Sequence, residues 1–337
     1  MDIKEQANFI WSIADLLRGN FKQSEYGKVI LPFTVLRRFD CVLAPSKEEI
    51  LERNKSLAVS NKAPIFKKYT GHDYYNVSKF DFEKLIDDSN NIDTNLKDYI
   101  NGFSDDVKEI LDRQITCNMA IANEGIHNSY GANIGHVILN MDSDCVKTRA
   151  KAYAAAGSDA RMNGCELPVV INSGSGNQGI TCCVPVVVYA KELDCTQEQL
   201  YRALVLSNLT AIYIKTGIGT LSAFCGAVSA GAAAGAGIAY LHNGTYKEIQ
   251  HTIVNALAIL SGTICDGAKA SCAAKIASSI DAGIMGYYMY KNKQQFYAGD
   301  GIVAHSVDET IQNIGTLGSQ GMLQTNDKII EMMISCD

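Results

Sequence analysis

Apolar residues recur at the three- and four-residue spacing of an amphipathic helix through the first third of the chain. Two such stretches cover residues 7–17 and 29–39, the second entered near Pro32, and shorter ones cover residues 80–86 and 96–103. Polar residues separate them. The pattern predicts a small domain built only from helices.

From Arg113 onward the chain becomes rich in Gly and Ala, with long segments of low charge. Alanine favours helix, while an interior glycine costs about 1 kcal/mol, so glycine at this density should serve close packing or access of a ligand to the backbone. We therefore expect a mainly α fold with a densely packed second part. Two apolar runs, residues 167–172 and 180–190, could be short strands or buried helix, and periodicity does not decide between them.

The change in composition near Arg113 is abrupt. Only four of the 28 glycines and one of the eleven cysteines precede it, although that stretch is a third of the chain. A length of 337 residues allows two domains. We expect a helical domain over residues 1–111 and a Gly/Ala-rich domain over residues 112–337.

Charge and hydropathy restrict the function. A net charge of -6 and a pI near 5.6 argue against a protein that wraps nucleic acid. The N-terminus does not have the pattern of a secretory signal, and the apolar segment 230–239 is too short for a bilayer span of about 20 residues. We expect a cytoplasmic homo-oligomer without membrane contact, in which the cysteines are reduced rather than paired in disulfides.

Three cysteines lie among Gly, Ala and Ser: Cys225, Cys265 and Cys272. Small neighbours let a backbone bend around a metal cluster, so that thiolates can reach iron. The six-residue gap between Cys265 and Cys272 is not a standard ferredoxin or zinc spacing. The residues by themselves leave cluster ligands and buried structural thiols as alternatives.

A short polar segment separates the two apolar runs and offers a second candidate site. Its central residues are Ser173, Gly174, Ser175, Gly176, Asn177 and Gln178. Such a segment exposes backbone N–H groups, and a helix beginning at its end would favour an anion such as the carboxylate of an amino acid. A tight surface turn is the alternative interpretation.

Longer stretches of sequence add a family resemblance. Residues 147–193, 215–241 and 256–303 are very similar to the C-terminal half of the L-cysteine desulfidase family, which is homologous to the α domain of bacterial iron-sulfur L-serine dehydratase. The resemblance covers roughly residues 110–335. It implies a lyase that eliminates the β-substituent of L-cysteine or L-serine.

This resemblance assigns roles to particular residues. It implies that Cys225, Cys265 and Cys272 hold a 4Fe-4S cluster, which acts as a Lewis acid, and that the segment 173–178 binds the substrate carboxylate. Lys215 and Lys269 are further catalytic candidates, with a structural role or ordinary solvated lysines as the alternatives. The remaining cysteines of this region match no family ligand and are expected to be packed thiols: Cys165, Cys182, Cys183 and Cys195.

The first third has a different resemblance. Residues 5–111 resemble the N-terminal helical domain of the methyltransferase (modification) subunit of type I restriction systems. That resemblance implies contact with DNA or with a specificity subunit. It does not imply methyl transfer, because the S-adenosylmethionine loop and the Asn-Pro-Pro-Tyr/Phe motif are not found. We interpret the basic pairs at 37–38 and 67–68 as solvated helix faces rather than DNA contacts.

The pattern of the desulfidase family is also broken. Its N-terminal half carries a Gly-Cys-Thr-Glu-Pro motif with an active-site cysteine, and this motif is not found here. The chain therefore resembles a chimera. Its lyase activity would need the missing cysteine to be supplied by a partner chain or by Cys336, and is otherwise lost. The alternative is a non-catalytic module that binds a restriction specificity subunit, or a recombination product.

Overall fold

The computed structural model describes residues 37, 39–59, 62–72, 74–103, 106–219 and 222–335. The chain divides into two compact units, residues 1–107 and 108–337. The division falls at the start of α7 (Asp106–His127), whereas composition predicts a boundary after residue 111. The predicted helix over residues 7–17, most of the one over 29–39, and Cys336 lie outside the described residues.

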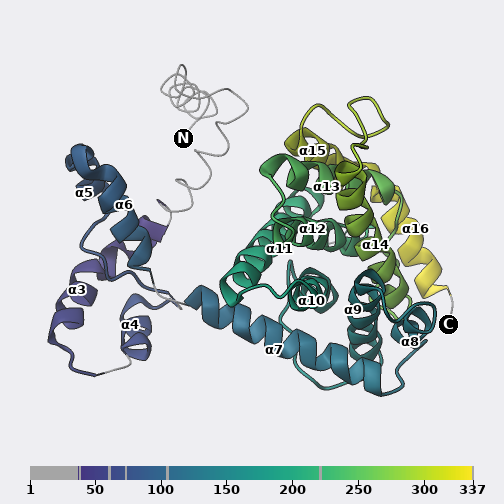
Figure 1. The fold of residues 1–337 in the computed structure, drawn as a ribbon, viewed down its shortest axis with the longest axis horizontal. Coiled ribbons are helices and arrows are strands. Elements are labelled where there is room, and N and C mark those ends of the chain that lie inside the picture. The colour runs from purple at the N-terminus through teal and green to yellow at the C-terminus, as the bar shows by residue number, and fades with distance from the viewer. Residues whose placement is uncertain are drawn as a thin grey trace. The chain divides into compact units, whose positions relative to one another are not determined.

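The first unit contains short helices joined by polar turns (Figure 1). Its described helices are η2 (Ala44–Ser46), α3 (Lys47–Ser56), α4 (Ala63–Thr70), α5 (Phe82–Asp87), η3 (Ser89–Asn91) and α6 (Ile92–Asn101). The helices predicted over residues 80–86 and 96–103 are confirmed as α5 and α6. Ile50, Phe66, Leu85 and Tyr99 are among its buried side chains. The Asp81 side chain caps α5 by accepting a hydrogen bond from the Lys84 N–H (2.9 Å).

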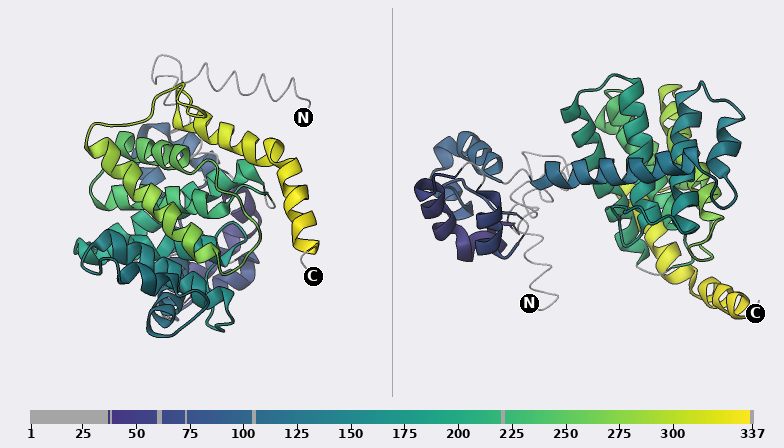
Figure 2. Two further views of the ribbon diagram at one scale, coloured as in Figure 1. Left: turned by 90° about the vertical axis from the view of Figure 1, so that its right-hand side faces the viewer. Right: turned by 90° about the horizontal axis from the view of Figure 1, so that it is seen from below.

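The second unit is a bundle of longer helices (Figure 1). After α7 they are α8 (Ile134–Leu139), α9 (Val146–Met162), α10 (Gly176–Glu192), α11 (Gln197–Ile218), α12 (Gly226–Leu241), α13 (Tyr246–Ile259), α14 (Cys272–Lys291), α15 (Val307–Thr316), the π-helical η4 (Leu317–Gly321) and α16 (Leu323–Ile334). Capping boxes at Thr196 and Thr245 start α11 and α13. Figure 2 shows α16 at the outer edge of this unit, where none of its residues is buried.

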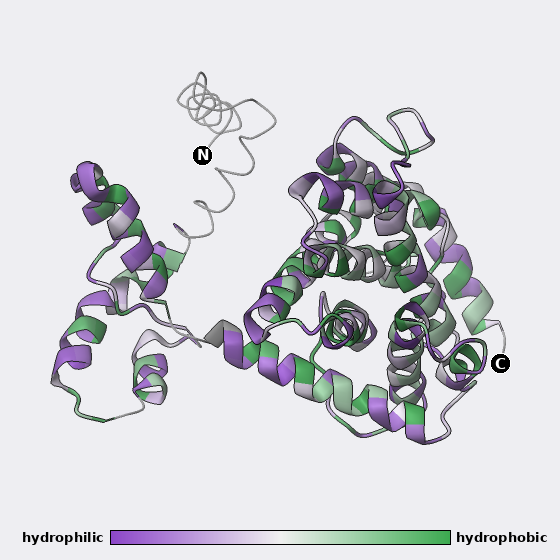
Figure 3. Cartoon of the chain, viewed as in Figure 1, coloured by the Kyte–Doolittle hydropathy of each residue, from purple (hydrophilic) through white to green (hydrophobic). Residues whose placement is uncertain are grey.

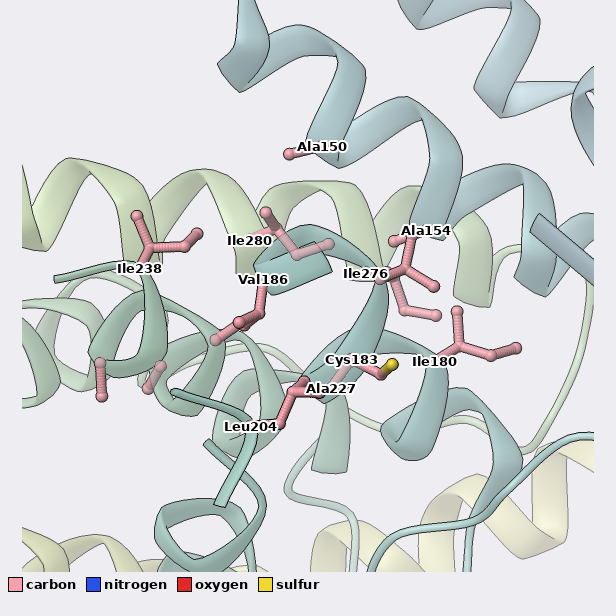
Figure 4. Close-up of a cluster of buried hydrophobic side chains, with 14 of the residues drawn as sticks. Ala150, Ala154, Ile180, Cys183, Val186, Leu204, Ala227, Ile238, Ile276 and Ile280 are labelled. Carbon is pink, nitrogen blue, oxygen red and sulfur yellow. The ribbon is translucent and has the colours of Figure 1, made fainter. Parts of the chain in front are cut away.

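Helix α10 lies at the centre of the second unit, with α9, α11, α12 and α14 packed around it. Ile180, Cys183 and Val186 of α10 point into the core between residues of the surrounding helices (Figure 4). All three side chains are fully buried. Because neighbouring helices cover every side of such a helix, its apolar residues are not confined to one face and do not recur at helical spacing in the sequence.

Glycine provides the close approach between α12 and α14. A Cβ atom on Gly235 would lie 2.6 Å from the carbonyl oxygen of Gly283, and one on Gly231 would lie 2.6 Å from the Cβ of Ser279. Contacts this short are not tolerated between real atoms, so only glycine fits. At these positions glycine serves helix packing, which is one of the two roles that the composition suggests.

The structure decides between strand and helix for the two ambiguous runs. Residues 180–190 are buried helix within α10, and residues 167–171 have no regular secondary structure. Among the described residues there is no β-strand, only isolated bridges such as Phe224–Ile264. The fold is mainly α, as predicted.

The outer helices are amphipathic, so hydrophilic (purple) and hydrophobic (green) residues alternate along their ribbons (Figure 3). Helix α15 illustrates this: Ile311 and Ile314 face the core, while Asp308 and Glu309 occupy its first turn. Within the residues that the structure describes, no helix is both long and apolar enough to cross a membrane.

Candidate functional site

The polar segment predicted as a binding loop forms a tight turn that leads into α10. Asn172 and Ser175 exchange backbone hydrogen bonds of 3.1 and 3.0 Å. Between them Ser173 (φ 49°) and Gly174 (φ 81°) are both left-handed, a combination found in type I′ turns. The N–H of Gly179 is the first to bond within the helix, to the Ser175 carbonyl (3.1 Å). The preceding N–H groups are therefore oriented toward the open end of α10.

Asparagine and glutamine side chains hold this turn in place. The amide of Asn172 donates to the backbone carbonyl (3.2 Å) and the side-chain oxygen (3.0 Å) of Asn208 on α11. Asn208 and Gln114 of α7 also exchange hydrogen bonds of 2.9 and 2.8 Å. Asn118 bonds to both the N–H and the carbonyl of Val170. These bonds fix the turn against α7 and α11.

Lys215 and the turn line one pocket of about 600 Å³. The lining residues are Ser173, Gly174, Ile212, Lys215, Thr216 and Gly219. Lys215 is only 8% exposed, and burial lowers the pKa of its ammonium from the ordinary value. Within the part of the chain that the structure describes, its amine has no carboxylate partner within ion-pair distance. The structure thus brings one predicted lysine to the predicted loop.

Two of the three predicted cysteines are in contact. Cys225 is the N-cap residue of α12, and its backbone N–H bonds to the carbonyl of Thr263 (3.2 Å). In return the N–H of Cys265 bonds to the carbonyl of Ala223 (2.6 Å). The side chains of Cys225 and Cys265 are hydrogen-bonded. The close approach of these two thiols follows from the bridge between Phe224 and Ile264.

The contact shifts the pKa values of the two thiols in opposite directions. The bond from Cys225 lowers the pKa of the Cys265 thiol; burial opposes this, and the N–H of Gly267 and the Lys275 ammonium reinforce it. The pKa of Cys225 is raised, first by the same bond and then by burial. Cys265 is therefore the thiol that ionises first.

Cys272 lies in the same loop at the first residue of α14. Its sulfur accepts from the backbone N–H of Lys269 (3.4 Å) and donates to the carbonyl of Gly267 (3.5 Å). Gly267 has a φ of 96°, which favours glycine in this bend. Among the residues that the structure describes, no group of three or more His, Cys, Asp or Glu side chains is placed to hold a metal ion.

Lys275 connects the three thiols electrostatically, and the sequence did not single it out. It forms an ion pair with Asp266. Burial by itself would lower the pKa of Lys275, but Asp266 and the nearby thiols of Cys225 and Cys272 raise it above the ordinary value. The same ammonium lowers the pKa of Cys265. The only sequence signal for Lys275 is that it follows Cys272 by three residues, a spacing that puts two residues on the same face of a helix.

Gln178 joins the loop to the cysteines. It is 7% exposed, and its amide lies against Gly226, the residue after Cys225, where a Cβ atom would be 2.6 Å from the side-chain nitrogen. Its side-chain oxygen has no hydrogen-bond partner among the residues that the structure describes. A buried acceptor without a donor is costly, so this oxygen is suited to receive a donor from a bound molecule.

Arg161 is a second residue that sequence reasoning missed. Its guanidinium donates to the side-chain oxygen of Asn177 (3.2 Å) and lies so close to Gly176 that a Cβ atom there would collide with it. A cation at the positive end of α10 adds to the preference of this end for an anion. Because Arg161 is distant in sequence from the loop, only the packing of α9 on α10 shows the relation.

The other predicted residues occupy simpler positions. The Lys269 side chain is exposed. Cys182 and Cys183 are fully buried, and the Cys183 thiol donates to the carbonyl of Gln114 (3.7 Å). Cys165 and Cys195 are partly buried against the core. All four fit the expected role of packed thiols.

Comparison with known proteins shows the family to which this chain belongs. The model of the serine dehydratase alpha chain matches residues 42–331, which include the turn, Lys215 and the three cysteines. The chain belongs to the serine dehydratase alpha chain family. The match begins well inside the segment 5–111, for which a restriction subunit was suggested, and that second resemblance stays a prediction.

Several curated relatives are similar to a large part of the chain. The chain is 62% identical over 231 residues to a UPF0597 protein of Desulfitobacterium hafniense, covering 68% of this chain and 54% of the relative. It is 54% identical to one of Lachnoclostridium phytofermentans over 68% of this chain and 55% of the relative. One of Finegoldia magna is 48% identical over 78% of this chain and 60% of the relative. The chain thus spans about half the length of these relatives. No solved structure matches it.

Proposed function

We propose that the second unit is the cluster-binding part of an iron-sulfur-dependent β-elimination lyase that acts on L-cysteine, with L-serine as the second candidate substrate. The observation that carries the proposal is the contact between Cys225 and Cys265 beside Cys272 and Lys275. Membership of the serine dehydratase alpha chain family supports the reaction class.

The donor set suits an iron-sulfur cluster. Thiolates are the usual ligands of such clusters. Cys225 is the N-cap residue of α12 and Cys272 is the first residue of α14. Cys225, Cys265 and Cys272 would hold the cluster. Cys272 would first exchange its bonds within its own loop for iron. When bound, the cluster supplies Lewis-acid activation of the departing thiol or hydroxyl.

The start of α10 would hold the amino-acid substrate. The N–H groups of the first turn of α10 and the Arg161 guanidinium favour the carboxylate. The unpartnered oxygen of Gln178 can accept a hydrogen bond from the α-ammonium group. These contacts would fix the α-carbon between the loop and the cysteines, which is what an elimination requires.

Lys215 would remove the α-proton. A base must be unprotonated near neutral pH, and burial lowers the pKa of this lysine in that direction. The pocket that it shares with Ser173 leaves room for substrate. Loss of the α-proton and of the β-substituent gives an aminoacrylate and sulfide or water. Addition of water to the aminoacrylate then yields pyruvate and ammonia.

The experiment is anaerobic reconstitution of the chain with iron and sulfide, followed by assays for pyruvate and sulfide from L-cysteine and for pyruvate from L-serine. We expect turnover that falls at least about 100-fold in Lys215→Met, the loss typical of a missing general base. Lys247→Met is the matched control, because that side chain is exposed on α13 and does not line the pocket. A reconstituted protein that binds iron but forms no pyruvate from either amino acid, alone or with the remaining part of a relative, contradicts the proposal.

A further inference from the structure

Helix α11 presents apolar side chains to solvent beside the candidate site. Leu209, Ile212 and Tyr213 are 60%, 45% and 45% exposed, and Ile171, just before the turn, is 58% exposed. The outward face of a helix in a soluble domain normally carries polar residues. Clustered exposed apolar residues instead indicate contact with another polypeptide. The α11 surface is defined as Ile171, Leu209, Ile212, Tyr213 and Thr216.

The α11 surface has a hollow on each side. One is the pocket of about 600 Å³ with Ile212 and Lys215, and the other, of about 530 Å³, lies against α15 and η4 beside Tyr213. Thr216 lines both. Lys215 is the only charged side chain among the described residues that line them. Depletion of charge around aromatic and aliphatic side chains is typical of the centre of an interface.

We infer that the α11 surface binds a part of the family polypeptide. That part is the region of the longer relatives that does not align with this chain. Those relatives carry 40–46% of their length beyond the aligned region. In this chain the α11 surface lies next to the pocket that Ile212 and Thr216 help to line. A polypeptide inserting aliphatic or aromatic side chains into the two hollows would cover both at once.

Docking there would also change the site. A partner seated on Ile212 would cover the mouth of the pocket and remove the remaining solvent exposure of Lys215, which is already 8%. Exclusion of water from a pocket strengthens the electrostatic interactions inside it. The inference concerns binding and stands whether or not the lyase chemistry is correct.

The test uses the full chain and, as a separate tagged polypeptide, the part of the Desulfitobacterium hafniense relative that its alignment with this chain leaves out. Analytical gel filtration and titration calorimetry measure the complex. We expect a complex of one copy of each, with affinity at least about 10-fold lower for Leu209→Glu and for Ile212→Glu, as for residues at the centre of an interface. Met141→Glu is the control, because Met141 is 80% exposed and lies outside the α11 surface.

Three results overturn the inference. They are the absence of a complex, a complex unaffected by both α11 variants, and self-association of the chain that Ile212→Glu abolishes, because the last would make a second copy the occupant. Thermal melting of each variant excludes unfolding as the cause of lost binding.

Hydrogen exchange in the intact relative gives a second measurement that does not require the separated part to fold. Side-chain burial of the α11 surface predicts slower exchange across the segment aligned with residues 205–217 in the relative than in this chain. Equal exchange in the two proteins overturns the inference. Formation of the complex without turnover would contradict only the lyase proposal.

Discussion

The side-chain amide of Gln178, near the start of α10, lies against Gly226 at the start of α12, in the space that a Cβ atom on residue 226 would occupy. This contact joins the turn proposed to bind the carboxylate to the residue next to Cys225. It places two candidate features, which are far apart in sequence, at one end of the helical bundle.

Replacing Gly226 by alanine tests this contact. The new Cβ would lie 2.6 Å from the nitrogen and 2.7 Å from the carbon of the Gln178 amide. Because these atoms are the far end of a side chain that can shift, we expect a loss of about 1 kcal/mol in the free energy of unfolding, at the low end for overpacked cores, and weaker iron binding. Urea denaturation measures the first and iron analysis the second. Gly262→Ala is the control, since nothing lies within 4 Å of its Cβ position; equal stability of the two variants would argue against the contact.

The packing of α12 on α14 gives a second prediction. Alanine normally stabilises a helix relative to glycine by about 1 kcal/mol. At Gly235 the sign should reverse, because the added Cβ would lie 2.6–2.8 Å from the backbone of Gly283. We expect Gly235→Ala to lower the free energy of unfolding by about 1–3 kcal/mol and to lower the melting temperature. A stabilised variant would show that the two helices lie farther apart.

The ionisation of Cys265 gives a prediction in the metal-free chain. Because the Cys225 thiol donates to it, the pKa of Cys265 lies below that of an ordinary thiol. Alkylation of Cys265 by iodoacetamide, followed by peptide mass spectrometry, should therefore have its pH midpoint below that of free cysteine. Cys225→Ala should move this midpoint upward, whereas Cys225→Ser keeps an O–H donor and should move it less. An unchanged midpoint in both variants would rule out the pairing.

Lys215 predicts a dependence of stability on pH. Its pKa in the folded chain is lowered by burial, so the unfolded chain binds this proton more readily. The stability of the folded chain should therefore rise with pH between the lowered pKa and the ordinary value of about 10.4. Lys215→Met should remove that contribution and be more stable than the parent near neutral pH. Urea denaturation across this range measures both slopes; parallel slopes would contradict a buried, destabilised ammonium.

Helical segments, glycine packing and the loop could be predicted from sequence because they depend on local spacing and composition. The run 180–190 could not be assigned, because a helix buried on all sides loses its periodicity. Lys275 and Arg161 were missed because their roles depend on which helices pack together. Cys225 and Cys265 were found, but their contact depends on the bridge between Phe224 and Ile264.

Iron binding tests the central claim most directly. After anaerobic reconstitution with iron and sulfide, we expect bound iron and broad visible absorption in the parent chain. Cys225→Ala, Cys265→Ala and Cys272→Ala should each lose most of both, while Cys195→Ala, a packed thiol, should keep them. A parent chain that binds no iron, or alanine variants at the three cysteines that bind as much as the parent, would contradict the account.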